Sequence, residues 1–326
     1  MKAELLRMLR NSKDYISGQE LCESFGVSRT AVWKVIKQLQ AEGYDIEAIT
    51  NKGYKLISYP EILSGCELMS RMNAQWAGRK VYFRKECEST NEDAKYLGDE
   101  GMDHGSLVVA QTQTGGKGRR GRSWDSPLGT SISMSLLLRP DFAPNQASML
   151  TLLMAISVAE VISKSCDLDV MIKWPNDILV NRKKVCGILT EMNAEMDYIN
   201  YVVIGVGINV NQKELPEELA EIATSLLMEK GERVDRNDLI LNIMEYFEYY
   251  YDIFVENGDV SAFVELYDGY LINRNETVRV LDPKGEYTGI AQGINDRGEL
   301  IVKREDGSIA RVYSGEVSVR GVYGYV

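Results

Sequence analysis

The stretch that decides how the centre of this chain folds covers residues 106–124 and reads Ser106-Leu107-Val108-Val109-Ala110, two further residues, and then Gln113-Thr114-Gly115-Gly116-Lys117-Gly118-Arg119-Arg120-Gly121-Arg122-Ser123-Trp124. Four consecutive apolar residues predict a short buried strand. The segment after it, residues 115–122, contains only glycine and basic residues. Because glycine lets a backbone approach a ligand closely and cations attract anions, this loop is a candidate binding site for an anionic ligand.

The order of residues excludes two common nucleotide-binding loops. A Walker loop needs Ser or Thr after its lysine, whereas Lys117 is followed by Gly118. The spacing of Gly116, Gly118 and Gly121 matches a dinucleotide fingerprint, but that fingerprint needs a helix directly after it, and a strand is predicted at 131–138 instead. Two interpretations stay open: a mobile loop that orders over a phosphate-bearing ligand, and a merely solvated basic loop.

The chain after residue 60 mixes strands with grouped helices, which predicts an α+β fold. A helix with several capping side chains is expected to begin at Glu88-Ser89-Thr90-Asn91-Glu92-Asp93. From about residue 272, short strands are separated by turns roughly every ten residues, which is typical of a small β-barrel. The other helical patterns lie at 61–80, 147–162 and 237–257, and further strands are expected at 81–83, 178–180, 185–191 and 198–204.

Residues 1–60 show the pattern of a winged helix-turn-helix. Ser17-Gly18-Gln19-Glu20 is a capping box, Gly26 makes the turn, and Ser28 caps a longer helix that ends near Gly43. Two short strands around the basic turn at 51–53 predict the wing. The rival interpretation is a helical domain that binds a protein partner and no DNA. The residues predicted to contact DNA are Ser28, Arg29, Thr30, Trp33, Lys34, Lys37 and Lys52.

Composition limits the kinds of protein this can be. The 326 residues are 44% hydrophobic and 26% charged, as in globular proteins of two or three domains. Nine basic and seven acidic residues give 1–59 a charge of +2 and leave −13 for the rest, which suggests two different functions. Five cysteines without a Cys-x-x-Cys pair and one histidine, His104, exclude a zinc ribbon and a His-rich metal site. Without about 18 consecutive apolar residues or a signal peptide, we expect a cytoplasmic protein with no membrane partner.

Four motifs together resemble those of the biotin–protein ligase family. They are Glu88-Ser89-Thr90-Asn91, Gly116-Lys117-Gly118-Arg119-Arg120-Gly121-Arg122, Lys173-Trp174-Pro175-Asn176-Asp177 and Gly205-Val206-Gly207-Ile208-Asn209. With the helix-turn-helix in front, the whole chain resembles the bifunctional members of that family, which are both ligase and biotin operon repressor. One position departs from the pattern. The family's loop usually begins Gly-Arg-Gly, and Lys117 here keeps the charge of that arginine but not its planar fork.

The resemblance implies roles for residues of all four motifs. Lys184, Arg119 and Asp177 would be catalytic, and Lys184 is preferred over Lys183 because it directly precedes Val185-Cys186-Gly187-Ile188-Leu189. The residues implied to bind biotin are Ser89, Thr90, Asn91, Gln113, Lys117, Gly118, Arg119, Lys184, Gly205 and Gly207. Those implied to bind ATP or the adenylate are Arg119, Arg120, Arg122, Trp124, Lys173, Asn176, Asn209 and Arg320. No dedicated metal site is expected, because Mg²⁺ would arrive with ATP.

The implied activity is the two-step formation of a carbon–nitrogen bond. Biotin's carboxylate would attack the α-phosphorus of ATP, and a lysine of a biotin carboxyl carrier protein would then attack the resulting biotinyl-5′-AMP. The adenylate would also promote formation of a homodimer, and the dimer would bind operator DNA and repress biotin genes. The expected domains are a winged helix (1–60), a ligase domain with a mixed sheet (61–271) and an SH3-like β-barrel (272–326).

Two alternatives from other functional classes stay open. The first is a non-catalytic repressor that senses biotin, against which the basic loop and Lys184 argue. The second is a lipoate or octanoate transferase, against which the Lys173–Asp177 motif and the C-terminal strands argue.

Overall fold

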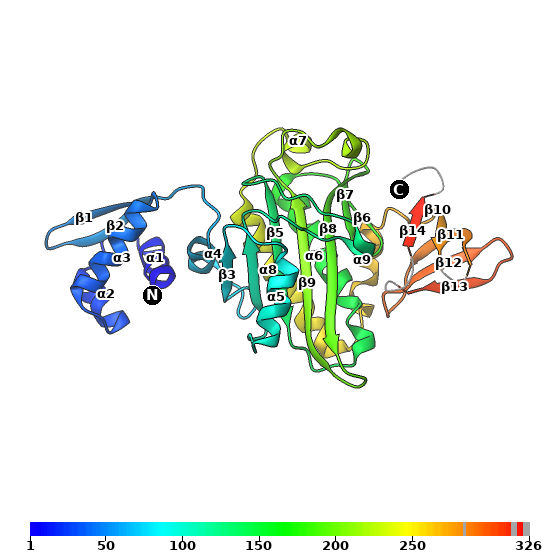
Figure 1. The fold of residues 1–326 in the computed structure, drawn as a ribbon, viewed down its shortest axis with the longest axis horizontal. Coiled ribbons are helices and arrows are strands. Elements are labelled where there is room, and N and C mark those ends of the chain that lie inside the picture. The colour runs from blue at the N-terminus through cyan, green and yellow to red at the C-terminus, as the bar shows by residue number, and fades with distance from the viewer. Residues whose placement is uncertain (283–284, 314–317, 322–326) are drawn as a thin grey trace. The chain divides into compact units, whose positions relative to one another are not determined.

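The chain folds into two compact units, Met1–Asn73 and Ala74–Val326 (Figure 1). The computed structural model describes residues 1–282, 285–313 and 318–321, the last four by their backbone alone. Helices and strands are both present and are grouped rather than alternating, so the predicted α+β class with an N-terminal helix-turn-helix is confirmed. The three-domain division at residues 60 and 271 stays a prediction.

The N-terminal unit is a winged helix followed by one further helix. As predicted, the side chains of Ser17 and Ser28 cap two helices, since their hydroxyls accept from the backbone N–H of Glu20 (3.1 Å) and Ala31 (3.3 Å). Gly26 ends the first of these helices with a φ of 63°. The elements are α1 (Lys2–Asn11), α2 (Gly18–Phe25), α3 (Arg29–Ala41), β1 (Asp45–Ile49), β2 (Gly53–Ser58) and α4 (Gly65–Arg71).

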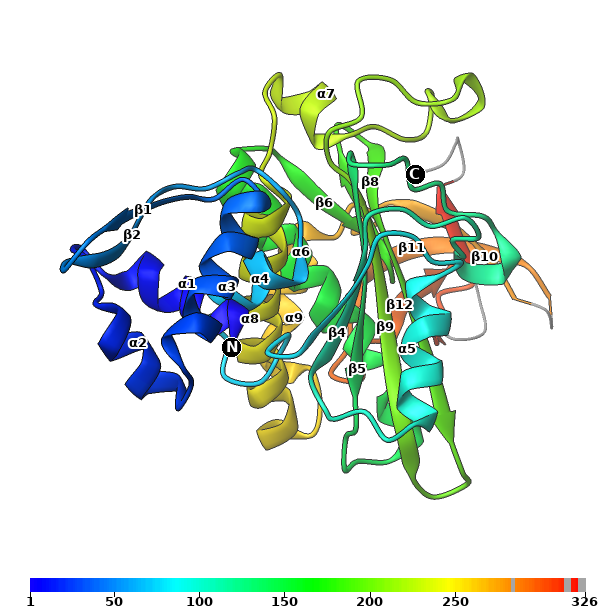
Figure 2. The ribbon, with the colours of Figure 1, turned by 60° about the vertical axis from the view of Figure 1, so that its left-hand side comes forward.

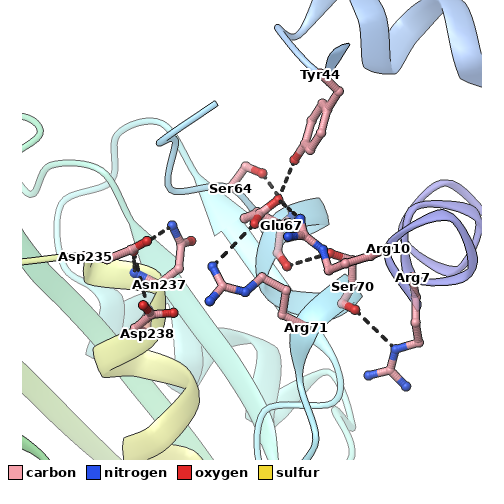
Figure 3. A network of polar contacts seen from close by, with 10 residues as sticks. All are labelled: Arg7, Arg10, Tyr44, Ser64, Glu67, Ser70, Arg71, Asp235, Asn237 and Asp238. Carbon is pink, nitrogen blue, oxygen red and sulfur yellow. Dashed lines mark hydrogen bonds and ion pairs between the residues drawn. The ribbon is translucent and has the colours of Figure 1, made fainter. Parts of the chain in front are cut away.

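The buried carboxylate of Glu67 is one of the groups that connect α4 to the rest of the N-terminal unit (Figure 3). Its residue is 1% exposed. It accepts hydrogen bonds from Tyr44 Oη (2.7 Å) and Arg10 Nη2 (2.9 Å), and Arg71 Nη1 lies 3.5 Å away. Because Arg10 is in the last turn of α1 and Tyr44 follows α3, this carboxylate joins three helices. The segment after the wing therefore folds as part of the N-terminal unit.

Among the described residues, the C-terminal unit contains a mixed seven-stranded sheet in the order β3-β4-β5-β9-β8-β7-β6. The β3–β4 pair is parallel and the other pairs are antiparallel. Figures 1 and 2 show α5 (Thr90–Asp99) on one face and α6 (Met149–Cys166) and α8 (Arg236–Asn257) on the other. The strands are β3 (Val81–Arg84), β4 (Ser106–Ala110), β5 (Ser131–Leu138), β6 (Val170–Lys173), β7 (Asp177–Val180), β8 (Lys183–Ala194) and β9 (Ile199–Asn209).

Helix α6 is the one helix of the described residues that is long and apolar enough to cross a membrane by length and composition. Most of it is buried between the sheet and α8, and Leu150, Leu153 and Ile156 are at most 1% exposed. It is therefore the core helix of the C-terminal unit.

Two short helices of the C-terminal unit, α7 (Leu226–Lys230) and α9 (Val264–Tyr270), flank α8 in the chain. The described strands after α9 form an antiparallel sheet in the order β13-β12-β11-β10-β14. Its strands are β10 (Thr277–Leu281), β11 (Tyr287–Ile294), β12 (Leu300–Arg304), β13 (Ile309–Val312) and β14 (Ser318–Gly321). Trp174 connects this sheet to the larger one. Its backbone N–H donates to Asn273 Oδ1 (3.2 Å), and its indole N–H donates to the carbonyl of Gly298 (3.1 Å). The tryptophan of the Lys173–Asp177 motif thus has a packing role.

The helical pattern predicted for 61–80 is only partly correct. The helix covers Gly65–Arg71, and the chain then leaves the helical conformation. Beyond this end, Glu248 on α8 binds the chain: its carboxylate accepts from the backbone N–H groups of Gln75 (2.6 Å), Trp76 (2.6 Å) and Ala77 (2.8 Å). Donors bound to a carboxylate cannot also bind the carbonyl one helical turn back.

Candidate active site

Two adjoining cavities lie beside the large sheet, under the glycine-rich loop. The inner cavity measures about 50 Å³ and the outer one about 380 Å³. All ten residues predicted to bind biotin line the inner cavity. Arg119, Arg120, Arg122, Trp124, Lys173 and Asn176, predicted to bind ATP, line the outer one together with Asp177. The residues common to both walls are Gly118, Arg119, Trp124, Asn176 and Lys184.

Two glycines of β9 form the floor of the inner cavity because no side chain would fit there. A Cβ on Gly205 would lie 2.1 Å from Asn91 Oδ1, and one on Gly207 would lie 2.4 Å from ring atoms of Trp124. Gly187 on the neighbouring strand pairs with Gly207 and faces Lys184 and Trp124 in the same way. The floor is therefore bare backbone, which a flat ligand can approach closely.

Buried polar side chains at the start of α5 form another wall. Thr90 donates from its backbone N–H (2.7 Å) and its hydroxyl (3.1 Å) to Gln113 Oε1. Asn91 Oδ1 accepts from Ser135 (2.6 Å), while its Nδ2 donates to Glu191 Oε2 (2.8 Å). The predicted cap of this helix is wrong in one respect, because the side chain of Ser89 makes no capping hydrogen bond and lines the cavity instead.

Lys184 lies at the junction of the two cavities. Its Nζ is 2.6 Å from Asp177 Oδ1 and 5.4 Å from the ring centre of Trp124. The neighbouring Lys183 extends elsewhere and donates to the carbonyl of Ala220 (2.7 Å). The turn between β7 and β8 places Asn181 and Arg182 at positive φ, as in a tight hairpin of mirror-image turn type. This hairpin pairs Lys184 with Leu179, two residues from Asp177 on β7.

The glycine-rich loop lies over the inner cavity and places Arg119 there. Arg119 Nη1 donates to Asn176 Oδ1 (3.0 Å), and burial lowers the pKa of its guanidinium, with nearby Asp177 opposing that shift. Lys117 Nζ forms an ion pair with Glu92 Oε1 on α5 (2.7 Å). The loop is thus attached to two different walls of the cavity through side chains that also line it.

Trp124 and Asn209 extend the site away from the sheet floor. Trp124 borders a third cavity of about 150 Å³, which Arg122, Lys184 and Asn209 also line. The indole Nε1 of Trp124 is buried and donates to no described atom, so this donor is available to a bound ligand. Asn209 Nδ2 donates to the carbonyl of Thr224 (3.1 Å), and Asn209 Oδ1 accepts from Gln212 Nε2 (3.1 Å). The backbone of Arg320 pairs with Arg279 on β10, but its side chain lies outside the described residues.

The seven residues predicted to contact DNA lie in the N-terminal unit, and all of them are exposed. Ser28 caps α3 and the next five lie on that helix, while Lys52 lies in the turn of the wing. Arg29 Nη2 donates to Gln19 Oε1 (3.1 Å), and Lys37 Nζ lies 5.9 Å from the ring centre of Trp33. The opposite face of α3, with Val32, Ile36 and Leu39, is buried.

Comparison with known proteins agrees with this geometry. Three family models match in succession: a helix-turn-helix domain over residues 2–55, the biotin/lipoate A/B protein ligase family over 84–209, and the biotin protein ligase C-terminal domain over 275–320. The bifunctional ligase/repressor BirA of Bacillus spizizenii is 39% identical over 98% of this chain and 98% of that one. The chain belongs to the biotin–protein ligase family. A BirA from Escherichia coli is 30% identical, over 97% of this chain and 96% of its own.

A solved biotin–protein ligase supports the same assignment for the ligase part. The enzyme of Aquifex aeolicus in complex with biotin and ATP matches with a TM-score of 0.67 at 32% identity, over 74% of this chain and 99% of that one. Because the BirA relatives match over both units, the predicted bifunctional family membership is confirmed. The biotin-specific C-terminal match speaks against the transferase alternative.

Sequence reasoning missed some residues of this ligase's site. Ile222 lines the outer and third cavities and Ala223 lines the third, because the segment at 222–224 pairs with Lys184. Glu92 lies in the helix start at 88–93 and outside the four motifs, and its contact with Lys117 connects it to the site. No cluster of three His, Cys, Asp or Glu side chains that could hold a metal occurs among the residues that the structure describes.

Proposed function

We propose that this protein attaches biotin to a lysine of a biotin carboxyl carrier domain through biotinyl-5′-AMP, and that the adenylate also controls its binding to operator DNA. The observation that carries the proposal is the shared wall of the two cavities. The inner cavity is lined by the residues predicted to bind biotin and the outer one by most of those predicted to bind the nucleotide, and two cations, Arg119 and Lys184, line both. A carboxylate from one side and an α-phosphate from the other would meet at these cations.

In the first step a carboxylate oxygen of biotin attacks the α-phosphorus, and the bond to the β-phosphate breaks to release pyrophosphate. The substrate carboxylate is itself the nucleophile, so no side-chain nucleophile is needed. Both reactants are anionic, and Arg119 and Lys184 reduce their repulsion and stabilise charge at the crowded phosphate. Asp177, 2.6 Å from Lys184, orients that ammonium. Trp124 would cover the nucleotide base, and Lys173 and Asn176 would position the phosphates.

In the second step the amine of the acceptor lysine attacks the carbonyl carbon of the mixed anhydride. An amide bond forms, the bond between the carbonyl carbon and the phosphate oxygen breaks, AMP leaves, and the amine gives up a proton. The cations that bound the phosphate also stabilise the departing AMP. The enzyme contributes positioning and charge rather than covalent participation, which agrees with a chain that has one histidine.

A direct assay tests the ligase half of the proposal. The protein is incubated with ATP, Mg²⁺, biotin and a carboxyl carrier domain, and the carrier is probed for covalent biotin by mass spectrometry. We expect a mass increase of one biotinyl group that depends on ATP. Lipoate and octanoate serve as matched substrates in parallel reactions. Transfer of either of these in place of biotin would support the transferase alternative, and biotin binding without transfer would support the non-catalytic repressor.

The repressor half rests on the exposed surface of α3 and on its modest charge. Residues 1–59 carry a net charge of +2, so one winged helix makes few phosphate contacts and binds DNA weakly at physiological salt. Two modules on paired half-sites would supply the missing affinity. We expect a homodimer that forms through the C-terminal unit when the adenylate orders the loop at 115–122, in a cytoplasmic protein with no membrane partner.

Sedimentation and DNA titration test this link. The protein is analysed with and without biotin plus ATP, and a fragment from upstream of the biotin genes is titrated under both conditions. We expect dimerisation and tighter operator binding only with both substrates. Operator affinity that does not respond to biotin plus ATP would exclude ligand-linked repression even if the ligase assay succeeds.

A further inference from the structure

Alternating charges connect the glycine-rich loop, through α5 and β8, to a wall of the inner cavity. Lys117 Nζ lies 2.7 Å from Glu92 Oε1, and Lys95 Nζ lies 2.9 Å from the same oxygen. Lys95 also pairs with Glu191 Oε1 (3.1 Å), and Glu191 Oε2 accepts from Asn91 Nδ2 (2.8 Å). The loop is thereby connected electrostatically to a buried residue of the cavity wall.

The internal bonds of the loop do not fix its position over the cavity. Within the loop, Gly118 N–H donates to the carbonyl of Arg122 (2.7 Å), and Trp124 N–H donates to that of Gly116 (2.8 Å). These bonds shape the loop but would survive if it moved as a body. The start of the loop is fixed by a backbone bond, in which Gly115 N–H donates to the carbonyl of Glu88 (2.8 Å). Farther along the loop, the side chains of Lys117, bonded to α5, and Arg119, bonded to Asn176, attach it across the cavity.

Lys117 can contact Glu92 and a ligand at the same time. An ammonium has three donors, so a contact with one carboxylate oxygen leaves donors for a ligand in the cavity that Lys117 lines. Hydrogen bonds from Lys117 and Lys95 lower the pKa of Glu92, so its carboxylate is ionised at neutral pH. Glu92 can therefore hold the lysine without taking its place in the binding site.

We propose that Glu92 is a positioning residue of the ligase: through Lys117 it holds the loop at 115–122 over the inner cavity and so slows the escape of bound biotin. This inference rests on the proposed ligase function. Glu92 itself does not line the inner cavity, so its effect on the ligand passes through Lys117. The side chains of Glu92 and Lys117 are 37% and 50% exposed, so water and salt screen their attraction. We expect the pair to be worth about a two- to fivefold change in rate, as for exposed ion pairs in general.

The test compares Glu92→Gln with the wild-type protein. Three quantities are measured: the biotin dissociation rate at low and high salt, the KM for biotin against kcat for adenylate formation, and the rate of tryptic cleavage after Arg119, Arg120 or Arg122. In Glu92→Gln we expect biotin to dissociate about two to five times faster, with little further acceleration by salt. KM should rise while kcat changes little. The loop should be cleaved faster even without ligand.

A matched control removes an ion pair of the same kind elsewhere. Lys80 and Asp103 form an exposed pair on the C-terminal unit that does not involve the loop. Lys80→Met should leave biotin dissociation and loop cleavage at wild-type values. A general loss of stability in Glu92→Gln would change the melting temperature but not the salt dependence of biotin dissociation.

A double-mutant cycle identifies the partner. Lys117→Met also removes a direct ligand contact and should have the larger effect, but adding Glu92→Gln to it should change the dissociation rate no further. Lys117→Arg should retain the salt dependence. The inference is overturned if Glu92→Gln releases biotin and exposes the loop as the wild type does, or if the two substitutions are additive. Failure of the wild type to biotinylate the carrier would instead refute the proposed function, and loop cleavage would still test the role of Glu92.

Discussion

Glu67 in the N-terminal unit and Glu92 beside the active site are each contacted by two cations, yet their surroundings differ. Glu67 is 1% exposed, accepts from Arg10 and Tyr44, and has Arg71 nearby. Glu92 lies at the surface and contacts Lys117 and Lys95. A buried carboxylate fixes its neighbours, because breaking its contacts leaves a charge without solvation. An exposed carboxylate holds its partner only weakly, because water can replace it.

This difference in burial agrees with the function proposed for each region. The N-terminal unit must present the exposed face of α3 in one orientation, which requires a rigid frame behind it. In the proposed mechanism the loop at 115–122 opens to admit a ligand and closes over it, which requires an attachment that breaks easily. Rigidity and mobility therefore come from the same residue types at different depths.

The pair formed by Lys184 and Asp177 extends the comparison, since it is partly buried and borders the reacting centre. Lys184→Ala should lower the rate of adenylate formation roughly 10²- to 10³-fold, or about 2.7–4 kcal/mol, because one preorganised cation is lost at the transition state. Pyrophosphate release from ATP and biotin measures this rate. Lys183→Ala is the matched control and should be unaffected, because Lys183 bonds the carbonyl of Ala220. An unchanged rate in Lys184→Ala would exclude this residue from catalysis.

A loss at the buried carboxylate should weaken the N-terminal unit. Glu67→Ala leaves Arg10, Arg71 and Tyr44 without their common acceptor, and we expect its free energy of unfolding to fall by about 3 kcal/mol, at the lower end for a broken buried ion pair because both arginines reach solvent. Hydrogen exchange of residues 1–73 in urea, followed by mass spectrometry, measures this. Operator binding should fall while carrier biotinylation stays. Equal exchange in variant and wild type would remove the contrast between Glu67 and Glu92.

A milder change separates the hydrogen bond from the charges. Tyr44→Phe removes only the hydroxyl that donates to Glu67 at 2.7 Å and leaves both arginines in place. We expect a loss of about 1 kcal/mol, the usual contribution of one hydrogen bond. The same exchange experiment should place this variant between Glu67→Ala and the wild type. A loss as large as that of Glu67→Ala would mean that the tyrosine, not the ion pairs, holds α4.

The smallest expected effect is a pH dependence confined to the C-terminal unit. His104, the one histidine of the chain, accepts from the backbone N–H of Arg139 (3.0 Å), and burial lowers its pKa. Unfolded histidine titrates near pH 6.5, so the unfolded state gains a proton first as pH falls. The stabilising contribution is complete above that pH and is lost as pH falls toward the folded pKa. Urea unfolding at pH 7.5 and 5.5 should show this decrease in the wild type and not in His104→Gln.

Local signals made the winged helix predictable. Ser17, Gly26 and Ser28 act on residues within a few positions of themselves, so capping and turn rules place α2 and α3 correctly. The helix expected at 61–80 failed for the opposite reason, since Glu248 takes the backbone donors of residues 75–77 from more than 170 positions away. No local pattern contains that information.

The site shows the same limit. Its ten predicted biotin-binding residues line one cavity, but the prediction came from resemblance to a family and not from spacing. Asn91 and Gly205 meet only because β9 lies between β5 and β8 in the sheet, an order that the sequence does not reveal. The contact between Glu92 and the loop was missed because nothing in the local sequence shows that the fold brings Lys117 to this residue of α5.

The close approach at Gly205 limits which mutations its codon can tolerate. A Cβ there would lie 2.1 Å from Asn91 Oδ1, in a wall where Asn91 is itself bonded to Ser135 and Glu191. Every amino acid that a single nucleotide change can substitute for glycine carries that carbon. Any missense mutation in this codon therefore displaces Asn91, and a population that depends on the enzyme should preserve the codon's first two bases while its third base drifts freely.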